Sequence, residues 1–469
     1  MRFRLPLMMI AVCCAALMSC AGRRESAPPV TPPPANVTWD PFLDTLQERT
    51  LRFFLDTTPQ NGLAYDRWPS HSPSSLGAVG YALTCYPIAV ERGLITRAEG
   101  ARRAATTLRY LYGLPQHPGS TAVSGYKGFF YHFVDVRDGS RYWNCELSTI
   151  DTGLMLMGAF TCHSYFDGTS ADETALRALT DSLYRRVDWQ WATNGGPGIS
   201  HGWKPESGFN TTTWRGYDES AFLIMLALGS PTHPVRDGMW EYWLEPCRWA
   251  DYRGQSFISF APLFGHQFSF CWIDFRGVTD RYIREKGIDY VENSRRATYA
   301  SRAYAIANPL GMKGYADTVW GMTACDGPGD TTFVVDGVSR RFTGYAARGA
   351  SFDWTLDDGT IAPAAAGGSL PFAPEICIPA LKAMRALHGD RLFRTYGFAD
   401  GFNMTYRTER WPDGWYDPDH VGIDQGPIAI MIENLRNGFV WKQIARNPYI
   451  ARGLRRAGFS GGWLAHAPQ

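Results

Sequence analysis

The 469-residue sequence lacks any strong excess of charge, because 46 Lys and Arg balance 45 Asp and Glu and leave a net charge of +1. Proteins that bind nucleic acid or anionic membrane surfaces usually carry a basic excess, so this balance favours neither partner. The ten histidines contain no HExxH motif, and the ten cysteines show no CxxC spacing. Zinc motifs are therefore missing, and we expect neither a metal nor an organic cofactor.

The cysteines are also too few and too irregular for a disulfide framework. Seven of them follow residue 20, which is an odd number. Those in apolar or helical contexts are predicted to be buried thiols: Cys145, Cys162, Cys271 and Cys377. After the N-terminal segment, no hydrophobic run approaches the length that a membrane-spanning helix needs.

The N-terminus has the pattern of a targeting signal. Arg2 and Arg4 precede an apolar stretch over 5–18 that is too short to span a bilayer. The string Leu17-Met18-Ser19-Cys20 resembles a bacterial lipobox, which predicts a signal peptide over 1–19 and lipidation of Cys20; an ordinary secretory signal is the alternative. The proline-rich residues 20–38 are predicted to be a tether. We therefore expect an exported protein, anchored by lipid in the periplasm or at the outer membrane.

Residues 39–465 are long enough for a large core, and we predict one domain there. Two kinds of helix are expected. Capping boxes at Thr96–Glu99 and Ser170–Glu173 begin amphipathic helices. Other segments are apolar all round, which is typical of buried helices: 76–90, 150–160, 220–228, 376–387 and 428–432.

This alternation of outer and inner helices predicts an all-α fold, the (α/α)6 toroid. A superhelical repeat array is the alternative, but no repeat of 30–45 residues is visible. Within the helical pattern, residues 331–347 carry Asp336-Gly337 at their centre and predict a small inserted β-hairpin.

Acidic residues recur at the predicted starts of the inner helices: Asp151, Asp218, Glu219, Glu375 and Asp424. If these helices run parallel around a ring, their first turns share one rim and the carboxylates converge. Each acid also has a simpler explanation, because a carboxylate at a helix N-terminus caps the helix and is stabilised by its dipole. Helix capping does not explain why aromatic residues lie near the same helix starts.

Two carboxyl groups in different environments are what glycoside hydrolysis requires. Glu219 lies beside Asp218 and before eight apolar residues, which would keep it protonated as the general acid. Asp424 lies between flexible glycines and is the candidate base. The aromatic content of 14% suits sugar stacking as well as an ordinary core. Candidate substrate contacts are Trp214, Glu206, Asp218, His266, Asp274, Arg276, Trp320, Asp326, Glu375, Trp411, Trp415 and Tyr416; Asp274 and Arg276 could equally be a structural ion pair.

Several strings together resemble the glycoamylase-like family of bacterial secreted proteins, which includes β-1,2-glucanases. They run in order from about residue 40 to 460: Ser148-Thr-Ile-Asp-Thr-Gly153, Tyr217-Asp-Glu-Ser220, Trp272-Ile-Asp-Phe-Arg-Gly277, Asn308-Pro-Leu-Gly311, Ala373-Pro-Glu375 and Gly422-Ile-Asp-Gln-Gly-Pro427. The resemblance implies an (α/α)6 barrel and an inverting hydrolase. It also implies Glu219 as general acid, Asp424 as base and Asp151 as a third acid of the site.

We therefore expect a glycoside hydrolase that acts on glucose-based chains, with β-1,2-glucan as the first choice of substrate. It would be a monomer whose only contact with a membrane is the lipid on its N-terminus. In an inverting enzyme the two carboxyl groups lie roughly 6.5–9.5 Å apart, or farther if a sugar hydroxyl relays the proton. An exo-acting glucoamylase or α-glucosidase, and a non-catalytic glycan-binding lipoprotein, are the alternatives.

Overall fold

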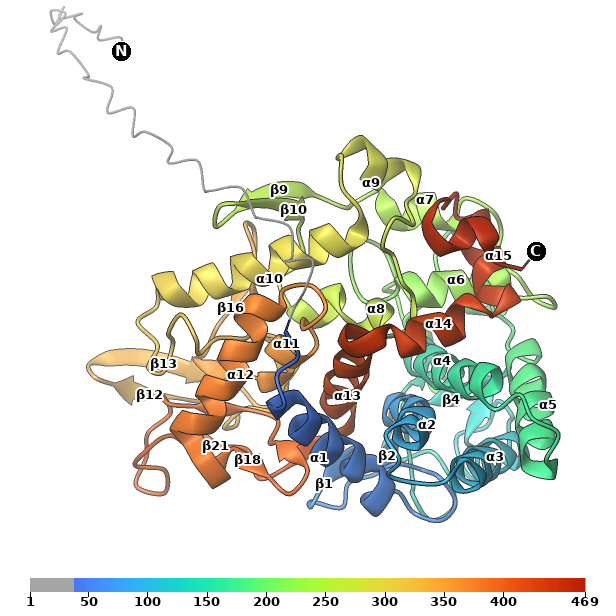
Figure 1. Cartoon of the computed structure of the whole chain (residues 1–469), viewed down its shortest axis with the longest axis horizontal. Helices are drawn as coiled ribbons and strands as arrows, with labels where there is room; N and C mark the ends of the chain where they lie inside the picture. Colours follow the sequence, from blue (N-terminus) through green and yellow to red (C-terminus); the bar gives the residue numbers. More distant parts are fainter. Residues whose placement is uncertain (1–37, 469) are drawn as a thin grey trace, which may run out of the picture.

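Helices dominate residues 38–468, which are the residues that the computed structural model describes (Figure 1). The predicted signal peptide, Cys20 and all but the last residue of the predicted tether lie outside this range. Within it, no helix combines the length and the apolar character needed to cross a membrane.

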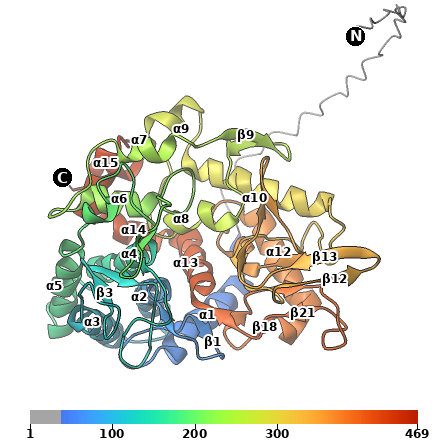
Figure 2. The ribbon, with the colours of Figure 1, turned by 180° about the vertical axis from the view of Figure 1, so that it is seen from behind.

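A set of almost completely buried helices occupies the interior, as the all-apolar segments predict. Their bounds are α2 (Leu76–Glu91), α4 (Thr149–Tyr165), α6 (Ala221–Gly229), α8 (Phe268–Trp272), α11 (Pro363–Gly367) and α13 (Gly422–Asn437). Helix α13 lies between the group α2–α5 and the group α10–α12 in both views (Figures 1 and 2). Helices α2 and α4 cross at glycines: a Cβ on Gly80 would lie 2.3 Å from the carbonyl oxygen of Leu154. Glycine at this crossing therefore permits the close packing of the two backbones.

The other helices are mostly amphipathic, with charged residues on their exposed faces. They are α1 (Phe42–Thr57), α3 (Arg97–Gly113), α5 (Ala171–Arg185), α7 (Met239–Leu244), α9 (Arg281–Glu285), α10 (Tyr290–Ala307), α12 (Pro374–His388), α14 (Phe439–Ala445) and α15 (Pro448–Arg456). Thr96 and Ser170 cap α3 and α5 as predicted. The prediction of an inner helix over 376–387 was wrong, because α12 exposes one face, including Lys382 and Leu387.

Short strands form small sheets, so the structure contains more β-structure than the one predicted hairpin. The strands are β1 (Arg67–Trp68), β2 (Ser74–Ser75), β3 (Gly125–Tyr126), β4 (Phe129–Tyr131), β5 (Phe133–Val134), β6 (Leu147–Ser148), β7 (Gly202–Lys204), β8 (Gly208–Phe209), β9 (Trp249–Tyr252), β10 (Gln255–Ile258), β11 (Ala324–Cys325), β12 (Thr331–Val335), β13 (Val338–Phe342), β14 (Ala346–Ala347), β15 (Gly349–Ala350), β16 (Thr355–Leu356), β17 (Thr360–Ile361), β18 (Phe393–Arg394), β19 (Gly397–Phe398), β20 (Phe402–Asn403), β21 (Trp415–Tyr416) and β22 (His420–Val421).

The predicted hairpin is present as β12 and β13 and extends from one end of the molecule (Figures 1 and 2). Asp336 and Gly337 turn between its strands with φ angles of 50° and 79°, as a two-residue type I′ connection requires. The largest sheet has the order β3-β4-β6-β7-β8.

Two strand pairs position the starts of buried helices. Strand β6 leads directly into α4, and its register sets Ser148 opposite Phe130. Strand β22 leads into α13, and antiparallel pairing with β1 sets Val421 opposite Arg67. Charged residues far apart in the sequence are thereby brought to the first turn of α13.

The cysteines within residues 38–468 are free thiols. All but Cys247 are buried, which confirms the prediction for Cys145, Cys162, Cys271 and Cys377. They therefore act as small apolar residues in the core.

Candidate active site

A cavity of about 420 Å³ lies where the starts of several buried helices meet. Its lining includes residues from the start of α2, α4, α8 and α13, together with Glu219 just before α6: Asp66, Arg67, Ser75, His132, Phe133, Trp143, Ile150, Asp151, Leu154, Glu219, Phe268, Tyr345, Val421 and Ile423. The sequence prediction that acidic helix starts converge is therefore met by Asp151 and Glu219, which both face this cavity.

Glu219 faces the cavity without a stabilising partner. Within residues 38–468, no other residue donates a hydrogen bond to its carboxylate, although its backbone carbonyl accepts one from Ser269. Burial raises the pKa of Glu219 to about 8, and the negative charges of Asp218 and Asp151 add to this effect. A carboxyl group in this environment is protonated at neutral pH and can donate its proton into the cavity.

Asp218 is held in a separate position behind Glu219. Its Oδ1 accepts hydrogen bonds from the Ser220 backbone N–H at 2.9 Å, the Ser220 hydroxyl at 2.5 Å and the Trp243 indole N–H at 3.1 Å. Burial raises its pKa to about 6, although these three donors oppose the shift. The two adjacent acids therefore differ in character: Asp218 is bound to the start of α6, whereas Glu219 is free to contact a ligand.

Asp151 combines a capping role with a place in the cavity. Its backbone N–H donates to the Ser148 hydroxyl oxygen at 3.1 Å, and that hydroxyl donates to Asp151 Oδ2 at 2.6 Å. His132 Nε2 lies 3.6 Å from the same carboxylate oxygen, and its Nδ1 lies 2.9 Å from Glu146. Burial lowers the pKa of His132, but Asp151 and Glu146 outweigh it and raise the pKa to about 9. Asp151 thus faces an imidazolium at neutral pH.

Asp424 lies in the first turn of α13, buried beside the cavity-lining Asp66 and Arg67. Burial raises its pKa to about 8, and the charges of Asp326 and Asp66 also raise it, whereas a hydrogen bond from Asp400 and the charge of Arg67 lower it. Burial and the charge of Asp424 raise the pKa of Asp400 well above its usual range. At neutral pH Asp400 therefore holds a proton that it donates to Asp424, and Asp424 itself is largely protonated, as Glu219 is.

The charges of the three predicted catalytic acids all act on Tyr81. Burial raises the pKa of its hydroxyl well above the usual range, and Asp424, Asp151 and Glu219 contribute to this shift through their charges. Three acids from α4, α13 and the segment before α6 thus lie close enough to influence one buried tyrosine. Of the residues that the sequence analysis named as catalytic, Asp151 and Glu219 line the cavity, whereas Asp424 lies beside it and is not part of its lining.

Several aromatic residues predicted to contact substrate are instead part of the core. His266 and Trp320 are completely buried, and Trp415 and Tyr416 are nearly so. Burial also lowers the pKa of His266 to about 4, so it is neutral. Trp214 is buried as well, and its indole N–H donates to a threonine hydroxyl on α4. These five predictions are corrected to packing roles, since aromatic rings fill cores as readily as they stack on sugars.

Other predicted contacts lie in ion pairs away from the cavity. Asp274 pairs with Arg276 at 2.7 Å, which is the structural alternative foreseen for them. Glu206 and Glu375 are each paired with an arginine. Among the predicted aromatic contacts, Trp411 remains half-buried on a loop outside the cavity lining.

Four charged residues of the site were not found from the sequence: Asp66, Arg67, His132 and Asp400. Arg67 donates to both carboxylate oxygens of Asp326, at 2.9 and 3.0 Å, and to Asp66 at 2.5 Å. Asp326 was predicted as a substrate contact, but this salt bridge holds it beside the cavity instead. The missed residues lie in loops and short strands that carry no local motif, and only pairing between distant strands brings them together.

Comparison with known proteins identifies the group to which this arrangement belongs. The family model Glycoamylase, described as "Putative glucoamylase", matches residues 211–448. A "putative glucoamylase" structure from Bacteroides fragilis is 30% identical, with a TM-score of 0.76, and the match covers 92% of this chain and 100% of that one.

Two β-1,2-glucan-acting proteins are also similar. An endo-β-1,2-glucanase from Chitinophaga pinensis, solved with sophorotriose and glucose, is 25% identical with a TM-score of 0.77; the match covers 91% of this chain and 100% of that one. An exo β-1,2-glucooligosaccharide sophorohydrolase (non-reducing end) from Parabacteroides distasonis is 25% identical over 90% of this chain. The present chain spans 58% of the length of that sophorohydrolase.

Proposed function

Because this chain belongs to the Glycoamylase family, we propose that it is a glycoside hydrolase that cleaves β-1,2-linked glucan with inversion at the anomeric carbon. The similar proteins from Chitinophaga pinensis and Parabacteroides distasonis, which are named for β-1,2-glucan substrates, support the choice of linkage. The observation that carries the proposal is the unpaired, protonated Glu219 carboxyl in a cavity that it shares with Asp151.

In the proposed mechanism, Glu219 donates its proton to the leaving glycosidic oxygen, directly or through a sugar hydroxyl. Asp424, in its ionised form, accepts a proton from the water that attacks the anomeric carbon from the opposite face. The bond between that carbon and the leaving oxygen breaks as the bond to water forms. His132 and Ser148 position the Asp151 carboxylate on the cavity wall, where it can accept hydrogen bonds from sugar hydroxyls.

We propose the (α/α)6 toroid as the frame of this site. In its support, the starts of α2, α4, α8 and α13, and the segment before α6, border one cavity. Helices α3 and α5 pack outside α2 and α4, as the outer ring of such a frame would. We also propose export and lipidation at Cys20, on the strength of the N-terminal sequence pattern, with a single copy as the working unit.

The test is incubation with glucans of defined linkage, followed by product sizing and by NMR of the first-formed anomer. We expect short glucose oligomers from β-1,2-glucan, none from maltooligosaccharides, and an α-configured new reducing end. Glu219→Gln should lower turnover at least about 100-fold, since general acid catalysis contributes 10²–10⁴-fold. Glu285→Gln, on the exposed face of α9, is the matched control and should keep full activity.

Three results would contradict the proposal. Cleavage of maltooligosaccharides alone would identify an α-glucosidase. Binding of glucan without release of reducing ends would identify a glycan-binding protein. Full turnover of β-1,2-glucan by Glu219→Gln would remove Glu219 as the proton donor.

A further inference from the structure

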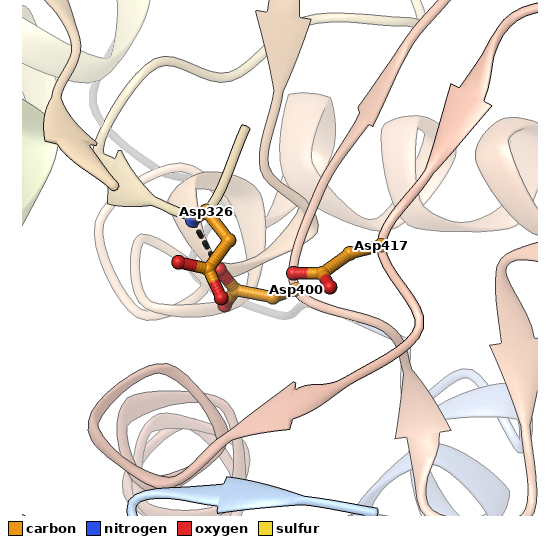
Figure 3. Close-up of side chains that lie close together, drawn as sticks. All are labelled: Asp326, Asp400 and Asp417. Atoms are coloured by element: carbon orange, nitrogen blue, oxygen red, sulfur yellow. Dashed lines mark hydrogen bonds between the residues drawn. The ribbon is translucent and has the colours of Figure 1, made fainter. Parts of the chain in front are cut away.

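Three carboxylates from distant parts of the chain converge beside the start of α13. Asp326 follows β11, Asp400 lies between β19 and β20, and Asp417 follows β21. One oxygen from each lies within 4.8 Å of the others, and Figure 3 shows the Asp417 carboxylate directed toward Asp400. We propose that these three residues bind a divalent cation of the size of Ca²⁺.

The strongest indication is that part of this cluster has no hydrogen-bond partner. Asp400 Oδ1 and Asp417 Oδ2 are buried, and no group within residues 38–468 donates a conventional hydrogen bond to either. Each residue is only 2% exposed. Buried carboxylates that lack a partner are costly, and proteins normally pair them or use them to coordinate a metal.

The nearest arginine does not supply the missing positive charge. Arg67 directs Nε and Nη2 to Asp326 and Nη1 to Asp66, so its guanidinium already bridges two carboxylates. Asp400 Oδ2 accepts only the Asp326 backbone N–H, at 2.6 Å. Asp417 Oδ1 accepts only the Asp419 backbone N–H, at 3.0 Å. Backbone donors orient these two side chains but supply no full positive charge, and burial and the neighbouring carboxylates raise the pKa of both groups, so protons neutralise them where no cation is bound.

The chemistry of the site selects a hard cation. All three donors are carboxylate oxygens, which suit Ca²⁺ and Mg²⁺ rather than zinc or copper. With bonds of 2.3–2.6 Å, two oxygens on opposite sides of Ca²⁺ are about 4.6–5.2 Å apart, so oxygens within 4.8 Å of one another can share one ion. Mg²⁺ usually keeps several waters and binds through one or two carboxylates. Three largely buried carboxylates therefore favour Ca²⁺.

The cation site goes beyond the proposed glucanase function and does not depend on it. A bound cation would connect the ends of β11 and β21 with the loop before β20, next to the first turn of α13. It would replace the proton that Asp400 otherwise shares with Asp424. Cation binding and glucan hydrolysis are measured separately, so the failure of one leaves the other intact.

The test is isothermal titration of the EDTA-treated, dialysed full chain with CaCl₂, without glucan. We expect one site per chain that binds Ca²⁺ more tightly than Mg²⁺. At a Ca²⁺ concentration 100 times the dissociation constant, the melting temperature should rise by about 3 °C for a domain of this size. Asp417→Asn should abolish both responses, whereas Asp413→Asn, at an 82% exposed side chain, should keep both.

The opposite outcome is equally specific. If protons alone neutralise the cluster, the wild type shows no heat of Ca²⁺ binding and no thermal shift, and Asp417→Asn is as stable as the wild type or more so. That result, or equal affinity for Mg²⁺ and Ca²⁺, would overturn the proposal. If Asp417→Asn does not fold, Asp400→Asn provides the same comparison, because Asp400 supplies another of the three carboxylates of the cluster.

Discussion

Asp218→Asn removes a negative charge beside Glu219 while preserving the contacts that hold the side chain. The three hydrogen bonds to Asp218 all end on Oδ1, and an asparagine keeps an acceptor oxygen at that position. The start of α6 should therefore keep its conformation. What changes is the electrostatic environment of the proposed proton donor.

The size of the effect follows from the pKa of Glu219, which rises from 4.5 to about 8 through burial first and the charge of Asp218 second. Removing the second cause should lower that pKa by about one unit. At pH 8 the protonated fraction of Glu219 would then fall from about one half to about one tenth, so kcat/KM should fall about fivefold. At pH 6 Glu219 stays protonated in both proteins, and the rates should agree.

The assay is kcat/KM on β-1,2-glucan between pH 5 and pH 9 for the wild type and Asp218→Asn. A general acid must be protonated, so activity is lost as pH rises through the pKa of Glu219, and the alkaline limb should move to lower pH in the variant. Asp251→Asn, at an exposed strand position, is the control and should leave the limb in place. An unmoved limb, or an equal loss of activity at every pH, would refute the assignment of Asp218 as the residue that keeps Glu219 protonated.

Three further predictions concern stability. Because the folded-state pKa of Glu219 lies above its unfolded value of 4.5, wild-type stability falls as pH rises from 4.5 through 8; Glu219→Gln should melt about 4 °C higher, relative to the wild type, at pH 8.5 than at pH 5, whereas a constant difference across pH would contradict the pKa. Arg348→Met leaves the buried Asp358 without its two hydrogen bonds of 2.8 Å and should cost about 3–5 kcal/mol in urea unfolding; a loss below about 1 kcal/mol would contradict it. Gly80→Ala should destabilise by about 1–3 kcal/mol or prevent folding, because its Cβ meets the α4 backbone, whereas Gly113→Ala at the open end of α3 should be neutral or slightly stabilising.

Local sequence patterns predicted the parts of the fold that depend on local physics. The caps at Thr96 and Ser170, the turn at Asp336-Gly337 and the apolar α4 each depend on residues within a few positions of one another, and the structure contains all of them. The prediction of a buried helix from apolar composition was wrong for α12. That segment carries few charges, yet one of its faces is exposed, and apolar composition alone does not distinguish exposed from buried residues.

The candidate site could be predicted only where its residues begin a helix. Glu219, Asp151 and Asp424 were found because a carboxylate before an apolar helix is conspicuous in a sequence. Asp400 was missed, because it reaches Asp424 only through the pairing of β20 and β21 and the return of the chain to α13. The aromatic assignments failed for the opposite reason: tryptophan and tyrosine are frequent throughout this chain, and most of those proposed lie in its core.

The backbone at the start of α6 decides which of two adjacent acids, Asp218 or Glu219, donates the proton. The free N–H groups of a helix start normally stabilise a nearby carboxylate and lower its pKa. Here Asp218 accepts the Ser220 N–H, and the Ser269 hydroxyl accepts the Phe222 N–H. Glu219 is therefore left beside the helix start without its donors. It gains the burial and the like charge of its neighbour but, within residues 38–468, no hydrogen bond from another residue to its carboxylate, and this combination keeps a carboxyl group protonated at neutral pH.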